Sequence, residues 1–144
     1  MLSSSRRKTN RTIHGVSGGF LGADAFDVDL DDSSLVGKGS QLGSGAIEVF
    51  DESRDLVQMA AKQTRFFKKE TCFKCEACVM GVEELADAFE FEKENESYDS
   101  WCLRVNSASK TMIRDGVCGF KSAAALTATS MISHFEDLLK NRLV

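Results

Sequence analysis

The feature that most constrains this chain is a set of four cysteines. Cys72, Cys75 and Cys78 are separated by two residues each, and Cys118 follows 40 positions after Cys78. A [4Fe–4S] cluster takes four thiolates that approach it from several directions. A short loop can supply three of them and a distant turn the fourth. The spacing therefore indicates an iron–sulfur cluster, and with it electron transfer.

Zinc is the main alternative, because Zn²⁺ also accepts four thiolates. Structural zinc sites usually draw them from two separate Cys-x-x-Cys pairs, whereas here the pairs overlap at Cys75 and Cys118 stands alone. The pattern favours iron–sulfur. A zinc-stabilised or metal-free assembly module and an inactive truncated copy remain the rival interpretations. The fifth cysteine, Cys102, follows Trp101 in an apolar helical stretch and is expected to be a buried free thiol.

Charge and composition limit the partners and the location. The chain has 144 residues and a formal net charge of -4, which argues against nucleic acid as the main partner. Residues 1–14 form a basic terminus, rich in Ser and Arg at its start, that is typical of an organellar presequence and equally of an unstructured terminus. We expect the mitochondrial matrix or a related organelle, and otherwise the cytoplasm. No apolar stretch is long enough to span a bilayer, so no direct membrane insertion is expected.

Hydrophobic periodicity predicts a mainly α fold, a four-helix bundle that carries the cluster at one end and follows a short β and loop remnant. One short strand is expected near Phe20 and Leu21, and another over 45–51. Helices are expected over about 54–69, 79–89, 101–115 and 121–139, with Asp51 or Ser53 as the first cap. The cysteine segments then join the first helix to the second and the third to the fourth, so both fall at one end of the bundle.

The residues around the cysteines suggest further roles. The ligands are flanked by apolar side chains that are expected to limit water around a cluster: Phe73, Val79, Val117 and Phe120. Lys74 and Glu76 are expected to point outward. The only histidines, His14 and His134, are expected to be structural or exposed. No strand–loop–helix signature for a nucleotide is present, and no residue set supports nucleophilic catalysis.

The chain resembles a known family in the segment GSGAIEVFDESRDLVQMAAKQTRFFKKETCFKCEACVMG, residues 43–81. The family is the flavoprotein (NADH-binding) subunit of respiratory complex I, with its relatives in NAD-linked hydrogenases and formate dehydrogenases. The shared features are a Gly-Ser-Gly strand, an acidic turn, a helix, an aromatic pair before a Glu-Ser-Cys-like start, and the cysteine triplet. The stretch from Cys118 to MISHF (131–135) is similar to the family's fourth-cysteine loop and closing helix.

The resemblance covers residues from about 15 to 142. It implies a partial β-grasp-like module over 15–51 and a helical cluster domain over 52–144, in which Cys72, Cys75, Cys78 and Cys118 hold the [4Fe–4S] cluster. That cluster would take electrons from flavin and pass them to the next cluster. The family's flavin- and NADH-binding domain is missing here, so FMN and NADH are expected only on a partner chain, and this chain alone is not expected to oxidise NADH. The implied partners are flavoprotein and iron–sulfur subunits of an NADH dehydrogenase or NAD-linked hydrogenase assembly.

The chain departs from the family within the cysteine loop. The family usually has Gly after the first cysteine, Pro before the third and Arg after it, where this chain has Phe73, Ala77 and Val79. The whole chain contains no proline. These differences leave the four cysteines in place and bear on the shape of the loop and the potential of a bound cluster.

Overall fold

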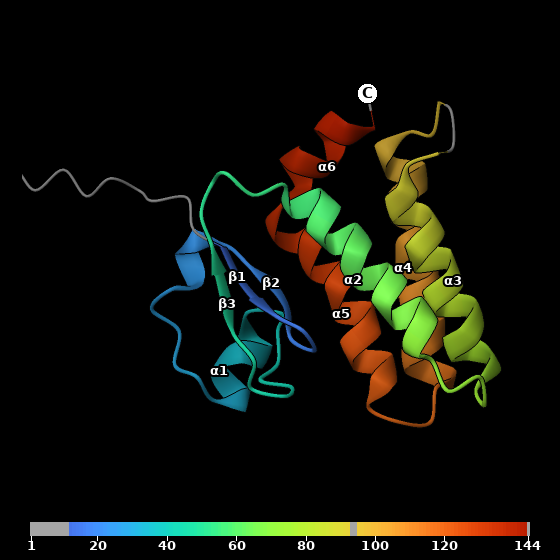
Figure 1. The fold of residues 1–144 in the computed structure, drawn as a ribbon, viewed down its shortest axis with the longest axis horizontal. Helices are drawn as coiled ribbons and strands as arrows, with labels where there is room; N and C mark the ends of the chain where they lie inside the picture. Colours follow the sequence, from blue (N-terminus) through green and yellow to red (C-terminus); the bar gives the residue numbers. More distant parts are fainter. Residues whose placement is uncertain (1–11, 93–94, 144) are drawn as a thin grey trace, which may run out of the picture.

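The computed structural model describes residues 12–92 and 95–143, which form a small sheet beside a bundle of helices (Figure 1). The strands are β1 (Thr12–Gly15), β2 (Gly19–Leu21) and β3 (Glu48–Phe50). The helices of the bundle are α2 (Leu56–Glu70), α3 (Glu76–Glu90), α4 (Tyr98–Asp115) and α5 (Phe120–His134), and α6 (Glu136–Arg142) follows them. The expected mainly α fold with a four-helix bundle is confirmed.

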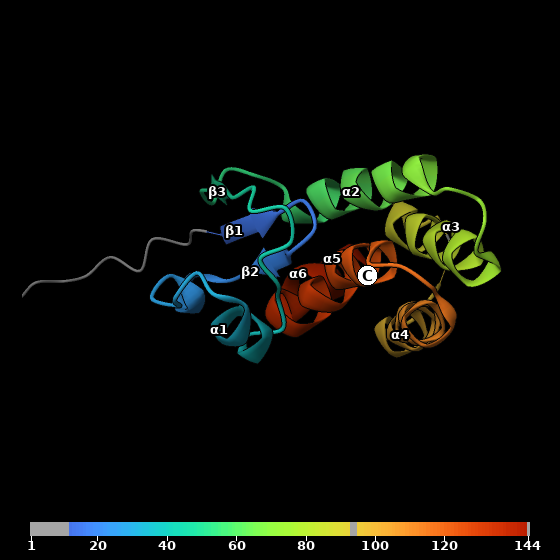
Figure 2. The same ribbon diagram turned by 90° about the horizontal axis from the view of Figure 1, so that it is seen from below.

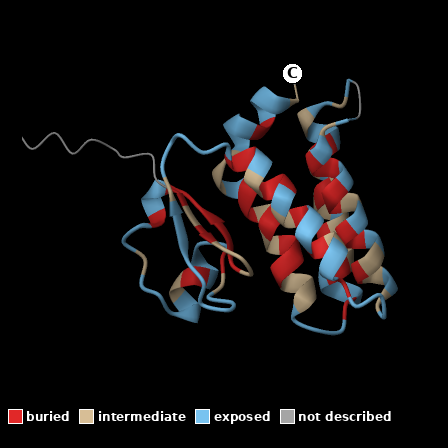
Figure 3. Ribbon diagram, in the orientation of Figure 1, coloured by how far each residue is buried: buried red, intermediate tan, exposed pale blue. Residues whose placement is uncertain are grey.

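Helices α2, α3 and α4 bury one face each, whereas α5 packs against both the bundle and β2 and is buried around most of its circumference; buried residues are red in Figure 3. Trp101 of α4 is completely buried at the α3–α4 contact, where its ring meets Phe89 edge-on at 5.2 Å between centroids. The indole Nε1 donates a hydrogen bond to the carbonyl of Ala88 at 2.8 Å, so its one polar group is satisfied in the core. Burial of apolar surface, at roughly 25 cal/mol per Å², is the main term that holds these helices together.

Helix α2 begins two residues later than the sequence predicted, and the cap is different. The carboxylate of Asp55 accepts a hydrogen bond from the backbone N–H of Gln58 at 3.0 Å, so Asp55 is the N-cap. Asp51 and Ser53, the expected caps, instead bond to each other in the preceding turn, where Asp51 accepts from the Ser53 N–H at 3.0 Å. Because the Asp51 carboxylate accepts a hydrogen bond in that turn, it does not cap α2.

The predicted final helix over 121–139 is divided into two. Phe135 has φ -136° and ψ 35°, which interrupts the helix between α5 and α6 although its N–H still bonds to Met131 at 2.9 Å. After the break, Leu139 is completely buried and Leu138 is exposed. Arg142 at the end of α6 pairs with Asp55 at the start of α2, 3.0 Å away.

The sheet has the order β2-β1-β3, with both pairs antiparallel. Two of its strands match the expected positions, whereas β1, the short 3-10 helix at Ala23–Ala25 and helix α1 (Asp32–Gly37) were not expected from the sequence. Because β1 begins at Thr12, residues 12–14 of the basic segment take part in the sheet; the rest of that segment, 1–11, lies outside the described residues.

The sheet is joined to the bundle through β2 and α5, which lie side by side in Figures 1 and 2. The N–H of Phe20 donates to the Ser130 hydroxyl at 2.8 Å. Gly19 has φ +80°, and a Cβ there would lie 2.8 Å from the Leu126 carbonyl oxygen. Glycine is therefore required at the point where β2 meets α5, for both its backbone conformation and its lack of a side chain.

His14 of β1 is a buried histidine in the small sheet, 4% exposed. Its ring stacks on Phe20 with 4.3 Å between centroids, and its Nδ1 lies 3.4 Å from the carboxylate of Glu48 on β3. Its Nε2 is buried and has no hydrogen-bond partner among the described residues. Burial lowers the pKa of His14, and the hydrogen bond and charge of Glu48 oppose this only in part.

A first prediction concerns the contact between α3 and α4. A Cβ added at Gly81 would overlap Cγ and Sδ of Met112, a residue with no exposed surface. We expect Gly81→Ala to lower the free energy of unfolding by about 1–2 kcal/mol, because the buried Met112 must move. Denaturant unfolding measures the difference. Gly37→Ala is the control, since nothing lies within 4 Å of a Cβ there, and its stability should be unchanged or slightly raised. Equal stability of the two variants would contradict the close packing.

A second prediction concerns pH. Since the folded-state pKa of His14 is lowered, the unfolded chain binds the extra proton first, with a pKa of about 6.5. His14 therefore contributes stability that is present above about pH 6.5 and is lost as the pH falls through the lowered pKa. Unfolding measured from pH 7.5 to 5 should show a weaker pH dependence in His14→Gln than in the wild type. His134→Gln, at the other histidine of the chain, which is half-buried at the end of α5, is the control variant. The same slope in all three proteins would refute the assignment.

Candidate metal centre

The four predicted ligands come from the two loops at one end of the bundle. Both loops lie at the lower end of the helices in Figure 1. Cys72 is exposed in the loop after α2, and Cys75 is the half-buried residue at the N-cap of α3. Cys78 lies in the first turn of α3 and is 2% exposed, and Cys118 is exposed in the loop between α4 and α5. The structure thus brings residues 40 positions apart to the same place.

The two loops meet at the sulfur of Cys75. The Cys75 sulfur lies 4.0 Å from the carbonyl oxygen of Asp115. The pKa of Cys75 is lowered chiefly by a hydrogen bond from the backbone N–H of Cys78, with the Cys78 thiol and the N–H groups of Val117 and Ala77 adding to the effect. Two of those N–H groups belong to the first turn of α3, where unpaired donors favour negative charge. The site is therefore suited to an anionic sulfur.

The pKa of Cys78 shifts in the opposite direction to that of Cys75. Burial raises the pKa of Cys78 to about 11, and the hydrogen bond with Cys75 and the charges of Cys75, Cys118 and Cys72 contribute to the rise. The thiols are thus close enough to influence one another. Four such sulfurs cannot all be ionised cheaply without a positive centre among them, and metal or iron–sulfur ligation provides one.

This donor set fits an iron–sulfur cluster. All four groups are sulfur, three come from one loop, and backbone N–H groups surround Cys75. Within residues 12–92 and 95–143, no group of three or more His, Cys, Asp or Glu side chains is placed to hold a single metal ion. A [4Fe–4S] cluster makes a different demand, since its four thiolates bind a multi-iron unit and need not converge on one ion. The assignment of the four cysteines as its ligands stays a prediction.

The expected apolar shell is only partly present. Val79 and Phe120 are half-buried, and the ring of Phe120 packs edge-on against Phe67 with centroids 5.5 Å apart. Phe73 and Val117, however, are 71% and 85% exposed, so their inclusion in a shell around the ligands is wrong. Phe73 lies in the reversal between Cys72 and Cys75 with φ +57°, the left-handed region. Its side chain lies at the surface.

Three other expectations concern residues that are not predicted ligands. Cys102 is half-buried beside Tyr98, and burial is the main cause that raises the pKa of its thiol. It lies 13 residues before the end of α4, about 20 Å along the helix from the cysteine loops. It is a free thiol outside the site, although less buried than expected. Lys74 and Glu76 are exposed, as predicted.

One residue at the site was missed. Thr71 directly precedes Cys72 and is 5% exposed, and its hydroxyl oxygen is buried without a hydrogen-bond partner among the described residues. The Thr-Cys pair is visible in the sequence, but burial of the hydroxyl depends on the packing of α2 and could not be read from the chain.

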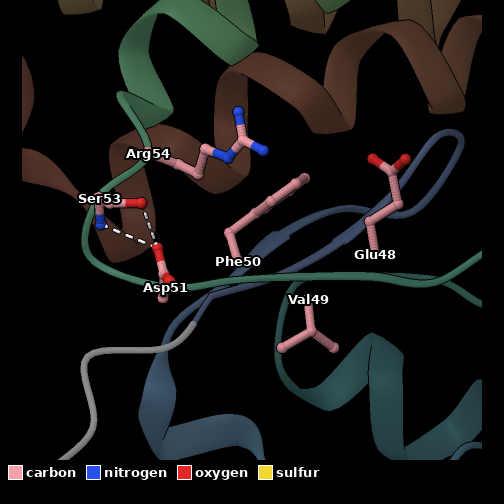
Figure 4. Close-up of a pocket in the computed structure, with 6 residues that line it drawn as sticks. All are labelled: Glu48, Val49, Phe50, Asp51, Ser53 and Arg54. Carbon is pink, nitrogen blue, oxygen red and sulfur yellow. Dashed lines mark hydrogen bonds between the residues drawn. The ribbon is translucent and has the colours of Figure 1, made fainter.

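A surface hollow of about 480 Å³ lies away from the cysteines, along β3 and the turn that follows it. Figure 4 shows Glu48, Phe50 and Arg54 on one side of the strand, with Val49 pointing to the other. Among the described residues β3 pairs only with β1, so its second edge is open. Ile47 and Val49 are 44% and 56% exposed there. No cysteine lines this hollow.

Comparison with known proteins decides the family. Residues 58–142, more than half of the chain, match the family described as the NADH-ubiquinone oxidoreductase-F iron-sulfur binding region. The chain belongs to this family. The resemblance inferred from the cysteine loop is confirmed, and the family's cofactor is a [4Fe–4S] cluster, for which the four thiols provide a suitable donor set.

Several relatives have high coverage of this chain. The F subunit of NADH-quinone oxidoreductase in Mycobacterium tuberculosis (strain ATCC 25618 / H37Rv) is 30% identical over 126 residues, 88% of this chain and 28% of the relative. The protein of the same name in Rickettsia bellii (strain OSU 85-389) is 27% identical over 115 residues, 80% of this chain and 28% of the relative. The crystal structure of an NAD+-reducing [NiFe]-hydrogenase in the air-oxidized state has a TM-score of 0.80 at 26% identity and covers 94% of this chain and 24% of that chain. This chain thus spans about a quarter of the length of these relatives.

The relatives are bacterial proteins, so they give no support to the expected mitochondrial matrix location. No helix in residues 12–92 and 95–143 has both the length and the hydrophobicity to cross a membrane.

Proposed function

We propose that this chain is an electron relay in which Cys72, Cys75, Cys78 and Cys118 hold one [4Fe–4S] cluster. The observation that carries the proposal is the meeting of both cysteine loops at the Cys75 sulfur in a chain of this family. When bound, such a cluster supplies one-electron transfer. The zinc alternative uses the same cysteines and is distinguished by the experiment below.

The protein's own residues have two tasks at this site. The N–H groups of Cys78, Val117 and Ala77 stabilise negative charge on the Cys75 sulfur. Burial of Cys78 keeps water from one side of the site, and the environment of the sulfurs is what sets a cluster's potential. Phe73 and Val117, which are next to Cys72 and Cys118 in the chain, are exposed and therefore accessible to a partner protein.

The electrons would come from a flavin on another chain and leave to a further cluster. The names of the relatives support an NADH dehydrogenase or an NAD-linked hydrogenase as the assembly. Within it we infer a division into a basic terminus (1–14), a partial β-grasp-like module (15–51) and the helical cluster domain (52–144). The open edge of β3, with exposed Ile47 and Val49, is suited to pairing with a sheet of the flavin-bearing chain.

An organellar location would rest on residues 1–11 alone. Their composition supports a presequence, and they lie outside the described residues.

The ligands can be tested by serine substitution. In anaerobically prepared protein, each of Cys72→Ser, Cys75→Ser, Cys78→Ser and Cys118→Ser should lower iron content and thermal stability, because ligation is coupled to folding. A broad reducible absorbance near roughly 400 nm should weaken in parallel. Cys102→Ser is the matched control and should change neither quantity. Iron loss in Cys102→Ser equal to that in Cys118→Ser would remove Cys118 from the ligand set. A wild-type protein with stoichiometric zinc and no such band would support the zinc alternative.

The glycine-rich segments of this chain lead to a separate prediction. The chain as given should bind no FMN and should not reduce an artificial acceptor with NADH, because the sequence offers no cradle of backbone amides at a strand–helix junction. Isothermal titration with FMN and an NADH-dependent dye assay measure the two properties. Stoichiometric FMN binding would mean that the glycine-rich segment 15–45 has been misinterpreted.

A further inference from the structure

The hydroxyl of Thr71 is an unexplained polar group at the cysteine end. Its oxygen is buried, and no hydrogen-bond partner for it exists among the described residues. Two other buried hydroxyls share this property, those of Ser109 and Thr127. Ser109 lies six residues before the end of α4 and Thr127 seven residues after the start of α5, about 10 Å along each helix from the loop between them. Only Thr71 is next to a predicted ligand.

Other hydroxyls in the bundle have a hydrogen-bond partner in the preceding turn of their own helix. Thr64 donates to the carbonyl of Ala61 at 3.0 Å, and Ser130 donates to the carbonyl of Leu126 at 2.5 Å. Such bonds to the preceding turn are the usual solution for a hydroxyl within a helix. Thr71 is the first residue beyond α2, with φ -62° and ψ 141°, so its backbone has already left the helix. Its hydroxyl makes no bond to the preceding turn.

A buried hydroxyl without a hydrogen-bond partner lowers the stability of the folded protein, so an acceptor for it is expected. The residue after Thr71 is Cys72, a predicted ligand, and the sulfur atoms of a [4Fe–4S] cluster would be hydrogen-bond acceptors at that position. We propose that the Thr71 hydroxyl donates a hydrogen bond to a sulfur of the bound cluster and so raises its reduction potential. This inference rests on the proposed cluster and adds to it a residue that is not a ligand.

The sign of the expected change in reduction potential follows from the charge that the cluster gains on reduction. Reduction adds an electron to the cluster, so its sulfurs become better acceptors, and a donor bonded to them stabilises the reduced form more than the oxidised form. Removal of that donor should therefore lower the potential. Thr71 acts through the environment of the sulfur atoms and is a positioning residue for the electron-transfer site.

The test compares Thr71→Val with Thr71→Ser in the full 144-residue chain reconstituted anaerobically with iron and sulfide. Valine has nearly the same shape as threonine and lacks the hydroxyl. We expect the midpoint potential, measured by redox titration of the visible absorbance, to fall in Thr71→Val and to stay at the wild-type value in Thr71→Ser. Thr127→Val removes a buried unpaired hydroxyl away from the loops and should keep the wild-type potential. Thr71→Ala should shift the potential in the same direction as valine.

Thermal unfolding provides a second readout that a structural role would not reproduce. In the protein without iron, Thr71→Val should be as stable as the wild type or more stable, because the unpaired hydroxyl is gone. The rise in Tm on cluster loading should be smaller in Thr71→Val than in the wild type. Loaded Thr71→Val with the wild-type potential, or an equal loss of Tm with and without the cluster, would overturn this inference alone. A wild-type chain that takes up no iron would overturn the proposed function as well.

Discussion

Two loops separated by 40 residues meet at the sulfur of Cys75, and this contact requires the ends of four helices to lie together. Residues 71–75 join α2 to α3, and residues 116–119 join α4 to α5. Connections this short place consecutive helices antiparallel and side by side. The packing of α3 on α4, through Trp101 and the close approach of Gly81 to Met112, then brings the two loops together. The site therefore depends on this helix contact as well as on the residues within the loops.

The chemical character of the site follows from where each sulfur lies on that framework. Cys75 at the start of α3 lies among backbone N–H groups that favour its thiolate, whereas Cys78 one turn later is buried and holds its proton. The two cysteines are three residues apart on one helix and have opposite shifts. The difference comes from the helix terminus, which supplies donors at its first turn only, and from the apolar core beneath the second residue.

The sheet has a different relation to the bundle. It is joined through β2, where Gly19 allows the strand to approach α5 and Phe20 bonds to Ser130. Among the described residues its other side ends in β3, which has no strand beyond it and lies next to the hollow of Figure 4, with Val49 and the preceding Ile47 exposed. This exposed apolar edge lies away from the cysteines, and the relatives, of which this chain spans about a quarter, are much longer.

The sequence alone determined the four long helices of the bundle, their order and the identity of the four candidate ligands, because these depend on local periodicity and on residue type at fixed spacing. Tertiary structure decided what depends on distant contacts: that Val117 donates toward Cys75, that Phe73 and Val117 are exposed, and that the hydroxyl of Thr71 is buried. It also decided the break at Phe135, since the residues on both sides of it have helical periodicity and the pattern along the chain gives no sign of a stop there. A pattern along the chain specifies which face of a helix is apolar. It does not specify which residue of another segment that face will meet.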